Sequence, residues 1–381
     1  MTSAPTLSDG TVTLRALEQR DIPGCYEQCI DPESVRWTTV PTPFTPEMAS
    51  RFCLEIAPAA WADSSQWIFA VEHTSDGGAG GQPSYAGNVA LRDEGHGRAE
   101  IAYGAHPAAR GTGVMERGLR LLLEWGFATQ GISTVIWRAN VGNWASRKLA
   151  WRLGFSLDGV LRHSQPARGE LVDAWIGTLL ANDPREPSHR WLTPVPLAGP
   201  TDGPGIRLRA FGGDDVPRIV EACSDERTQH WLGSMPSPYT QSDARFWLEH
   251  IVEGQAGGKK ITWAVVDRDT DLVLAAINIF DIDQHDCEIG YWAHPDSRGR
   301  GVLRAALRVV TSYAFAELGV ARVRVVAAIE NTASRHVAEA NGFTQTGTER
   351  MGTALRNGCA DVALYDVLAS EWASAAAVEE R

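Results

Sequence analysis

Cysteine is scarce in this chain, with six in 381 residues, and no pair has the CxxC or other spacing typical of metal ligands. The sequence therefore predicts no metal site, and free thiols in a reducing compartment. No apolar run approaches the length needed to cross a bilayer. The polar first ten residues also lack the apolar segment of a signal peptide. We expect a cytoplasmic protein without a membrane partner.

Basic residues are fewer than acidic ones, 35 Lys and Arg against 47 Asp and Glu, which gives a net charge of −12. Nucleic-acid binding needs a basic face, so we expect no nucleic-acid partner. The negative charge is compatible with a cationic amine substrate, but simple solubility is the preferred explanation. A length of 381 residues favours two domains or more.

One long stretch occurs twice at a constant offset of 188 residues, from Glu100 to Phe155 and from Glu288 to Phe343. The copies begin EIAYGAHPAARGTGVMERGLRLL and EIGYWAHPDSRGRGVLRAALRVV. A gapless repeat of this length indicates that one supersecondary unit was duplicated. We predict domains over 1–183 and 206–381, joined by a proline-rich linker over 184–205.

Each copy predicts a strand, a glycine-rich turn and a helix in that order. This arrangement aims free backbone N–H groups and the positive end of the helix dipole at an anion, here most plausibly a pyrophosphate. Two intact turns predict two such sites per chain, and Arg300 in place of Thr112 favours tighter binding in the second half. The predicted binding residues are Arg110, Gly111, Thr112, Gly113 and Val114, and Arg298, Gly299, Arg300, Gly301 and Val302.

The chain resembles the GNAT superfamily of acyl-CoA-dependent N-acyltransferases, closest to the RimJ/RimL branch that acetylates ribosomal-protein N-termini. The residues that carry the resemblance are the Arg-Gly-x-Gly turns, Asn-x-x-Ser at 143–146 and 331–334, and the Gly-Phe pairs at 154–155 and 342–343. The resemblance implies an α/β (α+β) fold of two tandem GNAT-like domains. Each would be a mixed, mostly antiparallel twisted sheet flanked by helices.

The resemblance also implies acetyl-CoA, or another acyl-CoA, as the group held at the glycine turns. The chain departs from the family three residues before the first glycine, where Ala108 and Asp296 replace the usual Gln or Arg. An aspartate near a pyrophosphate is unfavourable, so we expect Asp296 to face solvent. Asn143 and Asn331 are expected either to bind the pantetheine or to cap their helices.

Transfer to an amine needs a base, because an ammonium group at neutral pH has no free lone pair. Glu288 and its counterpart Glu100, at the strand beside each turn, are the candidate general bases. The alternative is that each carboxylate only accepts structural hydrogen bonds. Many family members place a tyrosine seven residues after the helix-opening Asn, but Ala150 and Ala338 stand there.

The resemblance implies that Ser146 and Ser334 instead donate a proton to the CoA sulfur. The alternative is that these serines cap a helix or bind pantetheine. His106 and His294 are interpreted as turn elements, because each precedes a proline at the end of a strand. Tyr103 and Tyr291, on the same strands, are interpreted as packing residues.

The resemblance implies that the acceptor site lies near the duplicated proline-rich loops, where Trp37 and Phe44, or Trp231 and Tyr239, either line a pocket or pack in the core. We predict an N-acyltransferase whose acceptor is a primary amine of a small molecule, a peptide or a protein N-terminus. Both halves keep the glutamate, the turn and Asn-x-x-Ser, which favours catalysis over a non-catalytic acyl-CoA-binding scaffold. A chain with only one catalytic half remains an alternative, as does either a monomer or a homodimer.

Overall fold

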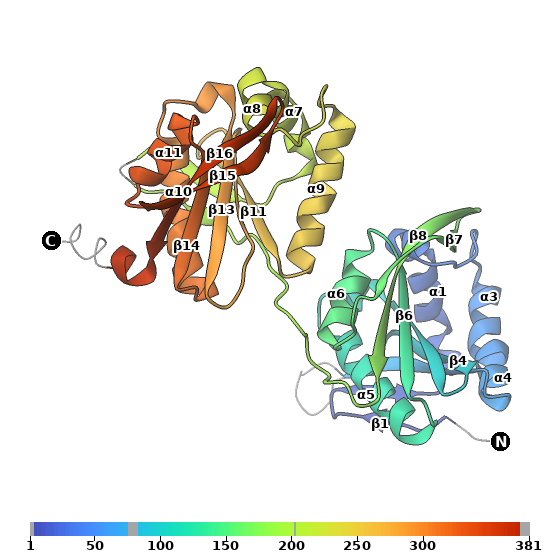
Figure 1. Cartoon of the computed structure of the whole chain (residues 1–381). Helices are drawn as coiled ribbons and strands as arrows, with labels where there is room; N and C mark the ends of the chain where they lie inside the picture. The colour runs from blue at the N-terminus through green and yellow to red at the C-terminus, as the bar shows by residue number, and fades with distance from the viewer. Residues whose placement is uncertain (1–3, 75–82, 202, 374–381) are drawn as a thin grey trace. The chain divides into compact units, whose positions relative to one another are not determined.

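The chain folds into two compact units in a computed structural model that describes residues 4–74, 83–201 and 203–373 (Figure 1). The N-terminal unit comprises Met1–Ser188 and the C-terminal unit His189–Arg381. Each unit contains one copy of the repeat. Each is built as an eight-stranded sheet with helices on both faces.

The N-terminal unit begins with two short strands and a group of helices, and the rest of the sheet follows. Its elements are β1 (Leu7–Ser8), β2 (Val12–Arg15), α1 (Ile22–Ile30), α2 (Pro32–Trp37), α3 (Pro46–Arg51), a π-helical turn (Phe52–Ile56), α4 (Ala57–Ala62), β3 (Gln66–Thr74), β4 (Pro83–Gly95), β5 (Arg98–Ala105), α5 (Val114–Thr129), β6 (Thr134–Asn140), α6 (Trp144–Arg152), β7 (Gly159–Ala167) and β8 (Glu170–Leu180).

The C-terminal unit repeats this order with one long helix in place of α3, the π-helical turn and α4. Its elements are β9 (Leu197–Ala198), β10 (Ile206–Arg209), α7 (Val216–Ser224), α8 (Glu226–Trp231), α9 (Gln241–Ala256), β11 (Lys260–Asp267), β12 (Val273–Phe280), β13 (Asp286–Ala293), α10 (Val302–Tyr313), a π-helical turn (Ala314–Leu318), β14 (Arg322–Ala328), α11 (Thr332–Glu339), β15 (Thr344–Leu355) and β16 (Gly358–Leu368).

Both sheets have the same topology, with strand orders β1-β2-β3-β4-β5-β6-β8-β7 and β9-β10-β11-β12-β13-β14-β16-β15. Every neighbouring pair is antiparallel except β5–β6 and β13–β14, which are parallel. These mixed, mostly antiparallel sheets confirm the predicted fold class. Because parallel strands need a crossover, the helix after each glycine turn connects the two strands of the parallel pair.

The segment expected to be a linker is partly built into the C-terminal unit. Leu192 is buried in that unit's core, and its amide N–H donates to the Gln255 carbonyl oxygen at 3.0 Å. Further along, β9 pairs with β10 through Leu197 and Leu208. The proline-rich composition concealed this short strand, because two residues are too few for a periodic pattern.

Within the described residues, no helix is long and apolar enough to cross a membrane. The same residues contain no group of three or more His, Cys, Asp or Glu side chains that could hold a metal ion. All six cysteines are free thiols, and only Cys359 is exposed.

Candidate active site

The site in each unit lies where its parallel strand pair opens. Pairing between β13 and β14 covers Asp286–Glu288 and Arg322–Arg324, and no further pair forms between these described strands although both continue. The N-terminal unit pairs Arg98–Glu100 with Thr134–Ile136 in the same way. Beyond the last pair, backbone groups of both strands face a gap instead of each other. Glu288 and Glu100 stand at the last paired position.

The glycine turns lead into helices whose N-cap residues, Gly113 and Gly301, have no side chain to cap them, although the Val114 amide N–H of α5 donates to Thr112 Oγ1 at 3.5 Å. Gly299 and Gly301 have φ of 72° and 74°, and Gly111 and Gly113 have 75° and 81°. Only glycine adopts this left-handed backbone without strain. A Cβ at any of the four would meet no atom within 4 Å, so the turns leave open space above the N-termini of α10 and α5. This is the geometry of an anion cradle.

The arginine of each turn is bound to a neighbouring helix. Arg298 pairs with Asp225, the N-cap of α8, and donates to Thr228 Oγ1 at 2.9 Å. This contact with Arg298 lowers the pKa of Asp225. Arg110 pairs in the same way with Asp31 at the start of α2. Both arginines therefore join the glycine turn to a helix, a role that the sequence pattern did not indicate.

A cavity of about 890 Å³ runs through the opened strand pair of the C-terminal unit. It extends from the turn at Gly299 and Gly301, past Tyr291 and Ser334, to Glu288 and the aromatic side chains of Trp231 and Phe280. Cavities of this size accommodate a ligand larger than most metabolites. Eight separate helices and strands contribute to its wall: α8, α10, α11, β12, β13, β14, β15 and β16.

The two candidate bases differ in their surroundings. The Glu288 side chain is 17% exposed, and its nearest cation is Arg324, whose Nη1 lies 3.6 Å from Oε2. Burial raises the pKa of Glu288, and Arg324 offsets part of that rise. Glu100 is instead held by two guanidinium groups, Arg138 at 3.2 Å and Arg92 at 3.4 Å. Glu100 is therefore engaged by two arginines, whereas Glu288 has one arginine at a longer distance.

The two serines bond to tyrosines that the sequence interpretation assigned only to packing. Ser334 Oγ donates to Tyr291 Oη at 3.2 Å, and the tyrosine hydroxyl donates to the Ser334 carbonyl oxygen at 3.2 Å. Burial raises the pKa of Tyr291 to about 12, so its hydroxyl stays protonated at neutral pH. Tyr103 and Ser146 form the same pair at 2.8 Å. The sequence did contain a signal for this pairing, because Tyr103 and Tyr291 keep the same 188-residue offset as Ser146 and Ser334.

The N-terminal site differs from the C-terminal site by one tryptophan side chain. Trp137, on β6, donates from Nε1 to Ser146 Oγ at 3.0 Å and lies 3.1 Å from Tyr103 Oη. It is 2% exposed. Val325 occupies the equivalent position in the C-terminal unit and lines the cavity there. The cavity of the C-terminal unit extends to Val325. In the N-terminal unit, the indole of Trp137 occupies the equivalent place.

The neighbouring strand compensates for this difference in size. Trp137 lies opposite Gly177, where an added Cβ would come within 2.1 Å of the Ser156 carbonyl oxygen and within 3.3 Å of the indole. Val325 instead lies opposite Tyr365, whose hydroxyl accepts from Arg335 at 2.9 Å. In both units a large residue lies opposite a small one. The large residue is on β6 in the N-terminal unit and on β16 in the C-terminal unit. Both cores are thereby filled, as close packing requires.

Polar residues near the turns cap local structure. Asn331 Oδ1 accepts the Ser334 amide N–H at 3.2 Å, and Asn143 does the same for Ser146. His294 Nδ1 accepts the Asp296 amide N–H at 3.2 Å, which is the turn role expected for it. The Asp296 side chain is 69% exposed and lies 3.2 Å from Arg218, so it faces solvent as expected.

Within each unit, the two aromatic candidates for the acceptor site are not brought together. Trp231 lines the cavity of the C-terminal unit, whereas Tyr239 is 7% exposed and packs in a core cluster beneath α7 and α9. Phe44 packs in the corresponding N-terminal cluster. Trp37 donates to Glu33 at 2.9 Å on its own helix. Phe280 and Trp292, which also line the cavity, had no separate signal in the sequence.

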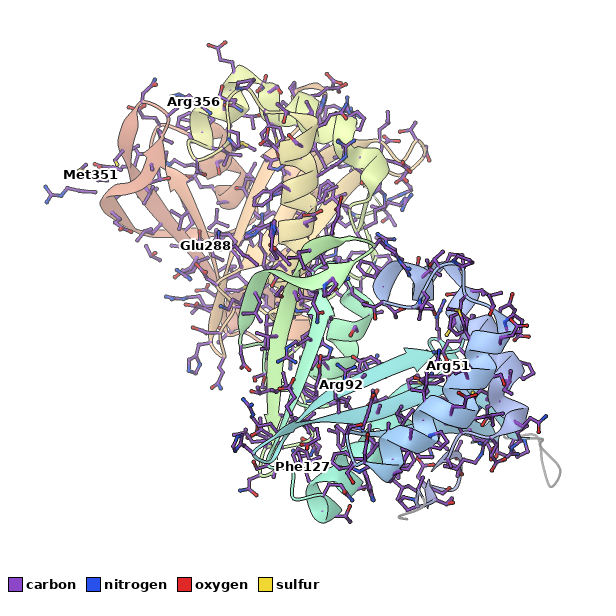
Figure 2. The ribbon with its side chains drawn as sticks, turned by 90° about the vertical axis from the view of Figure 1, so that its right-hand side faces the viewer. Arg51, Arg92, Phe127, Glu288, Met351 and Arg356 are labelled. Carbon is purple, nitrogen blue, oxygen red and sulfur yellow. The ribbon has the colours of Figure 1, made fainter. Side chains whose placement is uncertain are left out.

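The hairpin of β15 and β16 is tied to helix α8 by Arg356. This side chain pairs with Gln229 on α8 and donates to the Met235 carbonyl oxygen at 3.0 Å. Figure 2 shows Arg356 beside the yellow-green helices of this unit, and Met351 projecting from the same hairpin. A Cβ on Gly233 would come within 2.5 Å of Leu355, so the hairpin tip packs directly on the segment after α8.

Comparison with known proteins agrees with this geometry. A family model described as an acetyltransferase (GNAT) domain matches the chain twice, over residues 11–156 and 206–344. The chain therefore belongs to the GNAT acetyltransferase family, as the sequence motifs predicted, and it is an acyltransferase with two such domains in tandem.

Two bacterial relatives carry similar sequences. YdaF of Bacillus subtilis, whose name describes a ribosomal N-acetyltransferase, is 38% identical over 98 residues, which are 25% of this chain and 54% of that protein. The match thus spans about half the length of YdaF. The uncharacterized N-acetyltransferase p20 of Bacillus licheniformis is 25% identical over 182 residues, 47% of this chain and 97% of p20.

Among solved structures, RimJ of Mycobacterium smegmatis in complex with a CoA disulfide is 18% identical, with a TM-score of 0.42. That match covers 47% of this chain and 88% of RimJ, which is the size of one unit.

Proposed function

We propose that this acyltransferase transfers an acyl group, acetyl by default, from an acyl-CoA to a primary amine, and that the C-terminal unit carries out the transfer. Glu288 is the observation that supports this proposal. It is a half-buried carboxylate with a raised pKa, on a cavity that also reaches a glycine turn and a serine–tyrosine pair. The acceptor amine belongs to a small molecule, a peptide or a protein N-terminus.

The residues present fit an acyl-CoA. The amides that begin α10 and the open space above Gly299 and Gly301 would hold the pyrophosphate, with Arg300 adding positive charge. The bound group would supply the thioester that the amine attacks. The apolar side chains of Val302 and Val325, which both line the cavity, would exclude water from that end. In the N-terminal unit the turn residues 110–114 have the same fit, but Trp137 occupies the inner end.

Glu288 would accept the proton of the acceptor ammonium, directly or through a water, and so free the nitrogen lone pair. A carboxylate with a raised pKa is better suited to this task near neutral pH than an ordinary glutamate. Ser334, supported by the protonated Tyr291, would turn its hydroxyl toward the negative charge that develops at the sulfur. Asn331 holds the helix that presents Ser334.

The direct test is thiol release by the full chain, with acetyl-CoA and a panel of primary amines. We expect amine-dependent release of free CoA at a rate well above hydrolysis. Absence of amine-dependent release across small amines and peptides would contradict the proposal.

Replacing Ser334 by alanine should lower kcat from several-fold to about a hundredfold, because the change removes a hydrogen bond to developing charge. The KM for acyl-CoA should change little. Ser146→Ala, the same change in the N-terminal unit, should alter kcat less than Ser334→Ala does. Steady-state rates at saturating amine measure both. Full kcat in Ser334→Ala would contradict the assignment, and loss of CoA binding would indicate that the serine holds the pantetheine.

Replacing Arg356 by alanine should raise the KM for the amine by roughly tenfold, because it releases the hairpin from α8 and from Trp231. The KM for acyl-CoA should stay within about twofold. Arg168→Ala is the matched control, since Arg168 donates to the carbonyl oxygens of Val35 and Val40 in the N-terminal unit as Arg356 does around α8. An equal effect of the two variants would argue against a positioning role for Arg356.

A further inference from the structure

The cavity of the C-terminal unit is open to both faces of the sheet at β13, and successive side chains of this strand point to opposite faces. Ile289 and Tyr291 belong to the core cluster beneath α10, on the side of the glycine turn. Glu288 and Trp292 point to the other face, where Trp292 packs with Phe211 and Trp247. Since the donor fits the face of the glycine turn, the amine acceptor has to approach from the face of Glu288.

The wall around Glu288 on this second face is mostly apolar and aromatic, although Arg227 also lines the cavity and Asn278 Oδ1, close to Gly290, has no hydrogen-bond partner among the described residues. Phe280 is the direct cross-strand partner of Glu288, and its ring lies against Gly290, where a Cβ would come within 3.1 Å of it. The ring therefore covers β13 between the carboxylate and Trp292. Side chains at the end of α8 and from the β15–β16 hairpin also line the cavity: Trp231, Leu232, Thr353 and Leu355.

The N-terminal unit shows that the fold does not require this wall. The cross-strand partner of Glu100 is Arg92, which forms an ion pair with it at 3.4 Å. The residue equivalent to Trp292 is Gly104, which the Gln28 amide approaches closely. The C-terminal unit therefore differs by two large aromatic residues: Phe280, directly opposite its candidate base, and Trp292, further along β13 on the same face.

We propose that the C-terminal site selects primary amines whose carbon carrier is uncharged and apolar, with an aromatic or branched aliphatic group near the amine. This rests on the proposed function. The ammonium group is attracted to Glu288 and to the faces of the neighbouring aromatic rings. Its carrier then covers Phe280 and Trp231 and removes apolar surface from water. A charged carrier would lose hydration against the same rings, and that loss is unfavourable.

The test compares amines by kcat/KM with the full chain at saturating acetyl-CoA. The small-molecule arm uses 2-phenylethylamine, isoamylamine, ethanolamine and putrescine, and the peptide arm uses dipeptide amides beginning with Phe or Glu. We expect at least about a tenfold preference for the apolar member of each arm. The arm with the higher kcat/KM identifies the source of the amine. Equal rates or a preference for ethanolamine or putrescine would overturn the proposal.

Phe280→Ala should reduce the ratio of 2-phenylethylamine to ethanolamine at least about fivefold, while the KM for acetyl-CoA changes little. Phe246→Ala is the control, because Phe246 is 70% exposed on α9 and lies outside the cavity wall. Trp231→Ala serves as a second variant if Phe280→Ala does not fold. An unchanged ratio in a folded variant overturns the proposal. No turnover of any amine by the unmodified chain would instead contradict the proposed function.

Discussion

Replacing Glu288 by glutamine should lower kcat for amine acylation by about 10²- to 10⁴-fold, the contribution typical of a positioned general base. Glutamine keeps the size of the side chain but cannot accept the ammonium proton. Because Glu288 lies in the wall of the cavity and not at the glycine turn, the KM for acyl-CoA should change by no more than about threefold.

The same residue predicts a pH dependence. Burial raises the pKa of Glu288 above the usual range of a glutamate, and only the deprotonated form can act as base. The rate should therefore fall as the pH is lowered through this raised pKa, and the fall should begin at a higher pH than an ordinary glutamate would give. In Glu288→Gln this acidic limb should disappear. A profile of kcat/KM against pH for both proteins measures it.

Glu100→Gln provides the matched comparison. It removes the same carboxylate from the N-terminal unit, where Arg138 and Arg92 already neutralise it. We expect its effect on kcat to be less than about twofold. If Glu100→Gln were as damaging as Glu288→Gln, the N-terminal unit would contribute equally to turnover, and the assignment of catalysis to the C-terminal unit would be wrong.

Copying the N-terminal indole into the C-terminal unit should abolish transfer. The double variant Val325→Trp with Tyr365→Gly reproduces the pair formed by Trp137 and Gly177, so the added ring has room on the neighbouring strand. We expect kcat/KM for acyl-CoA to fall at least about a hundredfold. The indole N–H would donate to the hydroxyls of Ser334 and Tyr291, as Trp137 does in the N-terminal unit, and the ring would fill the inner end of the cavity.

Adenosine 3′,5′-bisphosphate distinguishes a filled cavity from a misfolded unit, since it probes the outer part of the donor site without reaching position 325. Its affinity should stay within about threefold in the double variant, with one cooperative unfolding transition retained for the unit. The reciprocal change, Trp137→Val alone, should leave the existing turnover in place; Gly177 is kept because a Cβ there would come within 2.1 Å of the Ser156 carbonyl oxygen. Full activity in the Val325→Trp double variant would show that the indole is compatible with the donor.

The sequence predicted the glycine turns and the Asn-x-x-Ser helices well, because each depends on residues that are close together in the chain. Positive φ at Gly299 and Gly301 and the capping of α11 by Asn331 are consequences of local backbone geometry. The equivalence of the two halves was less informative. Both keep every motif residue, so the motifs alone could not show that their sites differ.

The sequence by itself determined that this chain is a duplicated acyltransferase, since a gapless repeat carrying the same turn and helix signals requires no tertiary information. Only the tertiary structure decided how the two sites differ. Tyr291 and Ser334 are 43 residues apart, and the environments of Glu288 and Glu100 depend on side chains from neighbouring strands. Burial and side-chain volume act across such contacts, so whether Trp137 fills a site or Val325 opens one is settled by packing and not by the local pattern.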